Sequence, residues 1–200
     1  MIMTTRTDTH APKTTEPAPG LRVQVARDLF DTVPAIGNLV LARPQPAQHC
    51  MDFLRQLLQG GTPEEALTFM AFALMARHAV WWGHECLKAT PELLTEQDRE
   101  MMVLIAAWVA EQDDDSRYAA LEAGLRAAVH GPGVWLALGA GWSGGSMSGR
   151  GLPPVPPPVG ATGQALNAGI NSALARVPLD LRRRMIDHYV GMAEVLAKSP

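Results

Sequence analysis

The sequence has little charge, little cysteine and no long apolar run. Charged residues make up 18% of its 200 positions and the formal net charge is −3, whereas a dedicated nucleic-acid binder presents a basic face. Two cysteines, Cys50 and Cys86, are too few for a disulfide framework and favour a reducing compartment. The apolar runs near 69–76 and 101–110 are well short of the roughly 18 residues that cross a bilayer. We therefore expect a soluble, cytoplasmic protein with no membrane span and no nucleic-acid partner.

The alternating apolar pattern of a half-buried strand is also missing. Between residues 21 and 198 the apolar residues recur every three to four positions, which is the period of a helix. The sequence therefore predicts one compact all-α domain over 21–198, built from about seven to eight helices. Residues 1–20 are rich in threonine, proline and charge and lack the apolar core of a signal peptide. We expect a disordered tail there.

Capping residues mark several helix boundaries. Thr62 and Pro63 predict the start of a helix that runs through an apolar stretch and breaks near 75–78. Thr95, with Asp98 three residues later, predicts a capping box at the start of another helix. These signals agree with the helical period of the residues that follow them.

Two later helices have recognisable faces. The helix fronted by three consecutive aspartates is expected to turn Leu121 and Leu125 towards the core. Further along, small residues recur every fourth position and would let a second helix approach closely, so we consider them as a homodimer seam. These small residues are Ala161, Ala165, Gly169 and Ala173.

The segment 141–160, GWSGGSMSGRGLPPVPPPVG, is a long Gly/Ser/Pro-rich loop that contains two motif matches. G-W-S-G-G fits the G-x-S-x-G signature of a hydrolase nucleophile elbow. That elbow needs a strand before the serine and a helix after it, whereas here a helical segment precedes and prolines follow. The catalytic alternative that remains is a small enzyme or ligand-binding protein using Ser143 or Ser146 with His130 or His188.

The second match is RGLPPVP, from Arg150 to Pro156, which fits the R-x-x-P-x-x-P pattern. Peptides with this pattern dock as polyproline II helices into aromatic-lined grooves. The other interpretation is a strap that packs on its own domain, because about six polyproline II residues span roughly 19 Å and can cross two helices. We favour the self-packed strap and keep the docking peptide as the alternative.

Metal-binding patterns are missing as well. In the segment RHAVWWGHEC, His78 and His84 do not have the i,i+4 spacing of a zinc-binding helix, and no C-x-x-C pair is present. We expect no metal site and no cofactor. The short basic run 182–184 has aspartates four residues away, which favours ion pairs on a solvated helix over a phosphate site.

Three short motifs carry a resemblance to a known family. They are RHAVWW at 77–82, WSGGSM at 142–147 and PPVPPP at 153–158. Together they resemble the uncharacterised bacterial domain-of-unknown-function family 6931, from about residue 45 to the C-terminus. The resemblance implies no activity and therefore no catalytic residue. It suggests an accessory protein associated with a bacterial secretion or effector system, and a loop that packs over the helix of the paired tryptophans.

These observations favour a non-enzymatic helical adaptor or accessory protein that binds a protein partner. The small enzyme described above is the alternative. The expected partner-binding residues are aromatic or belong to the proline-rich loop: Trp81, Trp82, Trp142, Arg150, Leu152, Pro153, Pro154 and Pro156.

Overall fold

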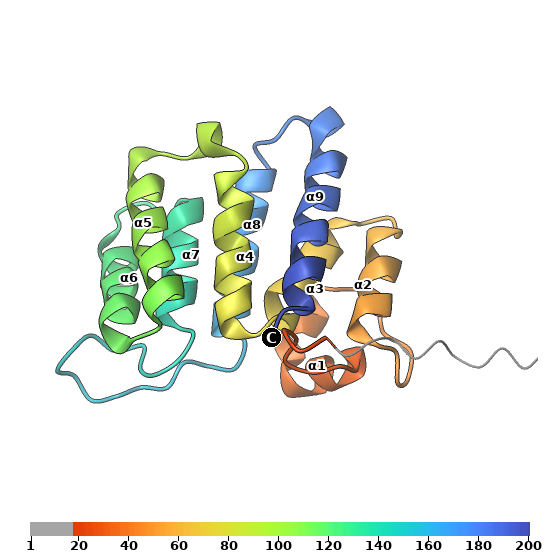
Figure 1. Ribbon diagram of the computed structural model, residues 1–200, viewed down its shortest axis with the longest axis horizontal. Helices are drawn as coiled ribbons and strands as arrows, with labels where there is room; N and C mark the ends of the chain where they lie inside the picture. Colours follow the sequence, from red (N-terminus) through yellow and green to blue (C-terminus); the bar gives the residue numbers. More distant parts are fainter. Residues whose placement is uncertain (1–17) are drawn as a thin grey trace, which may run out of the picture.

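The computed structural model describes residues 18–200, which form 9 α-helices, two short 3-10 helices and no strand (Figure 1). The all-α single domain predicted from the sequence is confirmed. In chain order the elements are α1 (Ala26–Thr32), η1 (Pro34–Asn38), α2 (Cys50–Leu58), α3 (Glu64–Ala73), α4 (Ala76–Lys88), η2 (Pro91–Leu93), α5 (Glu96–Glu111), α6 (Asp114–Arg126), α7 (Pro132–Gly141), α8 (Ala161–Leu174) and α9 (Leu179–Ala197).

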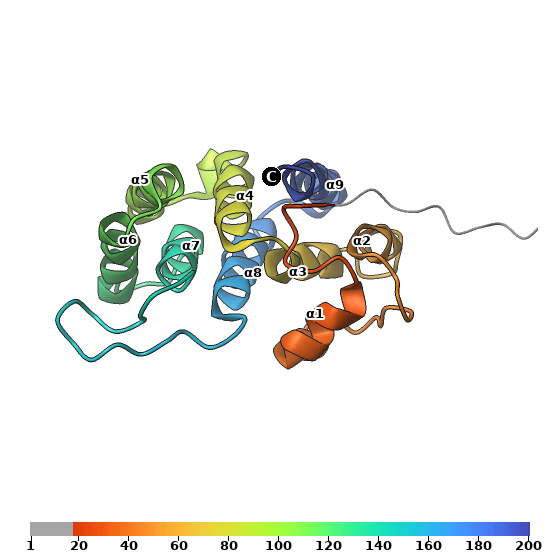
Figure 2. The ribbon, with the colours of Figure 1, turned by 60° about the horizontal axis from the view of Figure 1, so that its bottom comes forward.

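The helices pack in two rows, which are seen end-on in Figure 2. Helices α5, α4 and α9 form one row, and α7, α8 and α3 lie against it as the second row. Helix α6 closes one end, while α2 and α1 lie at the other end. Trp82 of α4 is among the largest fully buried side chains, and its indole Nε1 donates to the Tyr189 carbonyl of the neighbouring α9 at 2.8 Å.

The predicted break in the long apolar helix is confirmed, and it separates α3 from α4 at Leu74–Met75. Both residues are extended, with ψ near 147°. The segment at Gly20–Arg22 lies across the break: the Arg22 amide donates to Ala73 O and the Met75 amide donates to Gly20 O. The Ala73 carbonyl and the Met75 amide, which lack helical partners at the break, are thereby hydrogen-bonded within the fold.

This segment also corrects the predicted end of the N-terminal tail. Ala18 is 1% exposed, and the Gly20 amide donates to Ala197 O at 2.9 Å. Residues 18–20 therefore belong to the folded domain and not to a tail. The remainder of the predicted tail, residues 1–17, lies outside the described residues.

The small residues of α8 are buried within the chain and do not form a free seam. A Cβ atom built on Gly169 would lie 2.3 Å from Leu136 Cδ1 and 2.8 Å from the Pro132 carbonyl oxygen, both in α7. Gly139 of α7 also faces α8, with a built Cβ 3.2 Å from Leu166 Cδ2 and 3.4 Å from Ala165 Cβ. The interpretation of this stripe as a homodimer seam is wrong, because α7 of the same chain occupies it.

The buried carboxylate of Asp98 accepts hydrogen bonds at the N-termini of two helices. The predicted capping box at Thr95 and Asp98 is present, with Asp98 Oδ2 accepting from the Thr95 amide and hydroxyl at 3.0 and 2.8 Å. The other oxygen, Oδ1, accepts from the Gly133 amide in the first turn of α7 at 2.8 Å. Asp98 is fully buried, so this one residue fixes the position of α7 relative to α5.

Candidate functional site

The paired tryptophans of α4 point in different directions. Trp82 is 0% exposed and hydrogen-bonded within the core, so its assignment to a partner-binding surface is wrong. Neighbouring residues on a helix differ by about 100° in direction, and Trp81 is accordingly only half-buried. The Trp81 ring stacks on that of His84, with centroids 5.2 Å apart and planes within 9°. Only Trp81 of this pair can contact another molecule.

The proline-rich loop runs under the ends of α6 and α7 and returns to the start of α8 (Figure 1). We call residues 146–159 the proline strap. Within residues 18–200, the hydrogen bonds, ion pairs and ring contacts of its side chains outside the loop go to α6 and none reaches α4. Figure 2 shows the loop on the side of α6, α7 and α8, away from α4, so the predicted packing of this loop over the helix of Trp81 and Trp82 is wrong.

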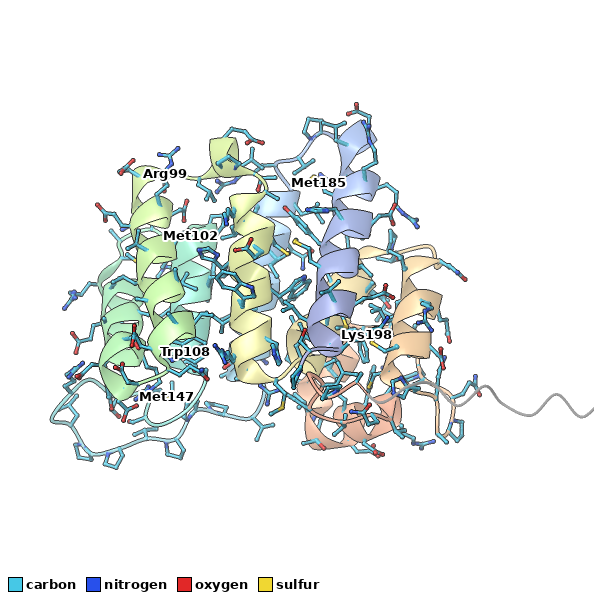
Figure 3. All side chains as sticks on the ribbon, in the orientation of Figure 1. Arg99, Met102, Trp108, Met147, Met185 and Lys198 are labelled. Atoms are coloured by element: carbon cyan, nitrogen blue, oxygen red, sulfur yellow. The ribbon has the colours of Figure 1, made fainter. Side chains whose placement is uncertain are left out.

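The base of the strap is closed by Ser146. This residue is 6% exposed, and its Oγ accepts from the Ser148 amide at 3.0 Å and from the Val155 amide at 2.9 Å. The Met147 amide donates to the Val155 carbonyl at 2.8 Å, and Met147 is labelled in Figure 3 at this end of the molecule. These bonds tie together two points nine residues apart and hold the intervening chain as a closed loop.

Arg117 of α6 connects this base to α7. Its side chain is 5% exposed, and Nη1 donates to the Gly141 carbonyl at 2.8 Å and to the Ser146 carbonyl at 2.9 Å. Nε pairs with Asp114 at 2.8 Å. Gly145, with φ of +59°, passes so close that a built Cβ would lie 2.6 Å from Arg117 Nη2. The Nη1 and Nε donors of a single guanidinium thus bind the C-terminus of α7, the start of the strap and Asp114.

Arg150, the basic residue of the R-x-x-P-x-x-P match, is held by its own domain. Its Nη1 pairs with Asp115 at 2.7 Å and its Nε lies 3.9 Å from Glu122. The guanidinium lies over the Tyr118 ring at 5.1 Å from the centroid. The hydrogen bond to Asp115 raises the pKa of Arg150 above its ordinary value. Arg150 is therefore held on α6 with its side chain 51% exposed, and the rest of the motif is apolar.

That apolar part is exposed along most of its length. Leu152, Val155 and Val159 are 64%, 48% and 66% exposed. We call these three residues, together with the four exposed prolines between them, the strap edge; the prolines are Pro153, Pro154, Pro156 and Pro158. Trp142 is half-buried at the base, where it lines a hollow of about 210 Å³ together with Pro157 and Arg22. The strap is therefore packed at its base and open along its edge.

The predicted catalytic residues do not form a catalytic arrangement. Ser143 Oγ donates to the Ala140 carbonyl at 2.6 Å, and Ser146 Oγ accepts the two amide bonds described above. His130 lies before α7 and contacts Trp135, so the full length of α7 separates it from these serines. His188 is exposed on α9. No hydrogen bond between a serine hydroxyl and a histidine occurs within residues 18–200.

Among residues 18–200, no three His, Cys, Asp or Glu side chains gather in a way that would hold a metal ion. Over the same residues, no helix combines the length and the apolar character that a membrane span requires.

Sequence reasoning missed a second surface, a groove between α4 and α5. Two adjoining hollows of about 500 and 410 Å³ share Ala106 and follow the two helices lengthwise. The available signal was spacing, because residues 77, 81, 84 and 88 share one face of α4 and 99, 103, 106 and 110 share one face of α5. We call this the α4–α5 groove; it is lined by Arg77, His78, Trp81, His84, Lys88, Pro91, Leu94, Arg99, Met102, Val103, Ala106, Val109 and Ala110.

These features define a small all-helical domain with a tied, apolar strap on one end and an open groove on one row of helices. The chain belongs to the family described as a family of unknown function (DUF6931), which matches residues 53–197. The predicted family membership is confirmed. No curated protein and no solved structure matches the chain.

Proposed function

We propose that this protein is a non-enzymatic helical adaptor that binds a protein partner along the strap edge. The observation that carries the proposal is the combination of apolar exposure with a fixed backbone. Leu152 and Val159 are about two-thirds exposed, while bonds from Arg117 and Val155 to Ser146 hold the base of the strap. Proline residues and closed loops lose little conformational entropy on binding, so a held, exposed apolar edge favours association.

The chemistry of the strap indicates the kind of surface that would receive it. A proline-rich segment is recognised by aromatic side chains that stack on the pyrrolidine rings, with apolar pockets for the intervening aliphatic residues. Arg150 is already paired with Asp115 and Glu122, so the partner need not supply an acidic site for it. We therefore expect a partner with an aromatic-lined, largely uncharged groove.

The test is affinity capture from cells that express the chain natively, followed by mass spectrometry. One bait carries Leu152→Ser, Val155→Ser and Val159→Ser, which removes the apolar side chains and leaves every proline in place. The matched control carries Leu179→Ser, Val129→Ser and Val195→Ser, which are 78%, 70% and 67% exposed elsewhere on the domain. A partner held by the wild type and the control but lost from the strap variant supports the proposal.

A partner retained equally by all three baits would show that binding lies elsewhere on the domain. The identity of the captured proteins also tests the suggested association with bacterial secretion or effector systems. Far-ultraviolet circular dichroism of each bait checks that the helical fold is intact.

A further inference from the structure

The α4–α5 groove is a second surface, separate from the strap. Helices α4 and α5 run antiparallel and lie side by side in one row of the fold (Figures 1 and 2). The lining residues of α4 extend from Arg77 to Lys88 and those of α5 from Arg99 to Ala110. The first and last residues of each range are eleven positions apart, which corresponds to about 16 Å of helix, so the groove runs along roughly three helical turns.

The floor and rim of the groove are apolar. Met102 and Val109 are 9% exposed and form part of the floor, while Val103 on the rim is 69% exposed. The stacked rings of Trp81 and His84 form the opposite wall. The exposed valine and the half-buried tryptophan line adjoining hollows, and the contact of such apolar surface with water is unfavourable.

The charged residues of the groove lie at its ends and are all basic. Arg77 lies at one end, and Lys88 and Arg99 lie at the other; Figure 3 shows Arg99 near the end of α5, with Met102 beyond it along the helix. The lining residues of the described chain include no aspartate or glutamate.

The existing partners of these cations leave them available to carboxylates. When the Gln112 amide is oriented with its oxygen towards Arg77, that oxygen accepts from Nε and Nη1 at 3.1 Å, so Arg77 has a neutral partner. Lys88 is 64% exposed and lies 3.5 Å from the half-buried Glu85, and the pair of Arg99 with Glu96 at 3.0 Å is exposed on both sides. Exposed pairs contribute little stability, so their cations can exchange to a bound carboxylate.

The backbone of the groove determines the shape of its occupant. Both walls are α-helices whose amides and carbonyls are already paired along the helix. An extended peptide would find no strand edge to pair with in this groove. A helix satisfies its own backbone and presents a stripe of side chains, and the ridges of a third helix fit the furrow between two others.

We propose that the α4–α5 groove binds an acidic amphipathic helix of about three turns, contributed by a partner protein. Its apolar face packs on Trp81, Met102 and Val103, and its carboxylates at the two ends meet Arg77 at one end and Lys88 and Arg99 at the other. This inference does not rest on the strap edge, and together the two surfaces would let one small domain hold two partners.

The test uses a random library of 14-residue peptides displayed on phage and selected against the purified chain. A parallel selection uses Val103→Glu, which places a negative charge on the rim of the groove. Its matched control is Val195→Glu on α9, because Val195 is 67% exposed against 69% for Val103. We expect the wild type and Val195→Glu to enrich peptides with apolar residues at i, i+3 or i+4 and i+7 and with acids near both ends.

The best peptide is then synthesised and titrated by fluorescence anisotropy. Val103→Glu and Arg77→Glu should each weaken its binding about tenfold or more, because each brings like charges together. Val195→Glu and the triple serine variant of the strap should leave the affinity unchanged. The Trp81 indole resonance should shift during the titration, whereas that of the buried Trp82 should move little.

Three outcomes would overturn the proposal. In the first, no peptide selected on the wild type loses its binding in Val103→Glu. In the second, the selection enriches basic or proline-rich peptides. The third is sedimentation of the chain with vesicles of phosphatidylcholine and phosphatidylserine, lost in Val103→Glu, which would assign the groove to anionic lipid. Failure of the groove test leaves the strap result intact, since the strap variant is scored separately by affinity capture.

Discussion

Single glycines determine how closely the central helices of this domain approach. Gly169 is buried, and any side chain there would meet Leu136 and the Pro132 carbonyl of α7. Gly191 provides the contrast, because it lies exposed in the middle of α9 and has no atom within 4 Å of a built Cβ. The same residue type therefore serves close packing at one site and is merely tolerated at the other.

This contrast gives a paired prediction. Gly169→Ala should lower the free energy of unfolding by about 1–3 kcal/mol, because the added methyl group forces α7 and α8 apart. Gly191→Ala should raise it by roughly 0.5–1 kcal/mol, because alanine is the better helix former where space is open. Urea unfolding followed by circular dichroism measures both changes. Equal effects of the two substitutions would contradict the close packing of α8 on α7.

Asp98 is a second single residue on which the placement of two helices depends. It accepts hydrogen bonds at the start of both α5 and α7 and is fully buried. Asp98→Ala should destabilise the fold by about 2–4 kcal/mol, since two helix caps are lost and buried donors are left unpaired. Asp113→Ala, which removes the cap of α6 at the surface, should cost only about 1 kcal/mol. The same urea measurements compare the two variants.

At the scale of elements, local signals predicted the helices well. The capping box at Thr95 and the break between α3 and α4 both stand where the sequence indicated. Short elements stabilised by distant contacts were not predicted. Helix α1 has only seven residues, and the segment before it is held by backbone bonds to Ala73 and Ala197. No local pattern encodes such bonds.

The orientation of helices that are apolar on several sides was also beyond sequence reasoning. Trp81 and Trp82 look equivalent in the sequence, yet only the fold determines which faces α9. Leu125 was predicted to face the core and is 54% exposed, because α6 lies at one end of the two rows and only part of its surface is covered. The contacts of the strap were missed for the same reason, since they depend on Arg117 and Asp115 of a distant helix.

The hold of Arg117 on the base of the strap can be tested by substitution. Arg117→Lys keeps the charge but cannot donate to Gly141, Ser146 and Asp114 together, as the arginine does. We expect amide hydrogen exchange at Ser148 and Val155 to become at least about tenfold faster, because the base of the strap opens more often. The helical content should stay near that of the wild type.

Arg126→Lys is the control for this experiment. Arg126 is also on α6, but its side chain is 73% exposed and pairs only with Glu122 at 3.5 Å. Exchange within the strap should not change in this variant. If Arg117→Lys leaves the exchange of Val155 unaltered, Arg117 does not hold the strap in place.

For the molecule as a whole, buried acids with raised pKa values link stability to alkaline pH. Burial raises the pKa of the Cys50 thiol from 9.0 to about 12, with a smaller contribution from the charge of Asp28. Burial likewise raises the pKa of the Tyr189 phenol from 10.0 to about 12. Cys86 is shifted in the same direction by burial and by Glu85. In the unfolded chain all three lose their protons at lower pH than in the folded chain.

Alkaline pH should lower the free energy of unfolding, because the folded chain keeps these protons at a pH where the unfolded chain releases them. Because the folded pKa values exceed the unfolded ones, the stabilisation from these groups is complete below about pH 9 and is lost as the pH rises towards 12. The free energy of unfolding should therefore be flat from pH 7 to 9 and then fall by a few kcal/mol, which urea titrations at successive pH values would measure. In the double variant Cys50→Ala and Tyr189→Phe the fall should be shallower, since two of the responsible protons are absent. If the free energy of unfolding of the double variant falls as steeply as that of the wild type, the alkaline sensitivity comes from groups other than Cys50 and Tyr189.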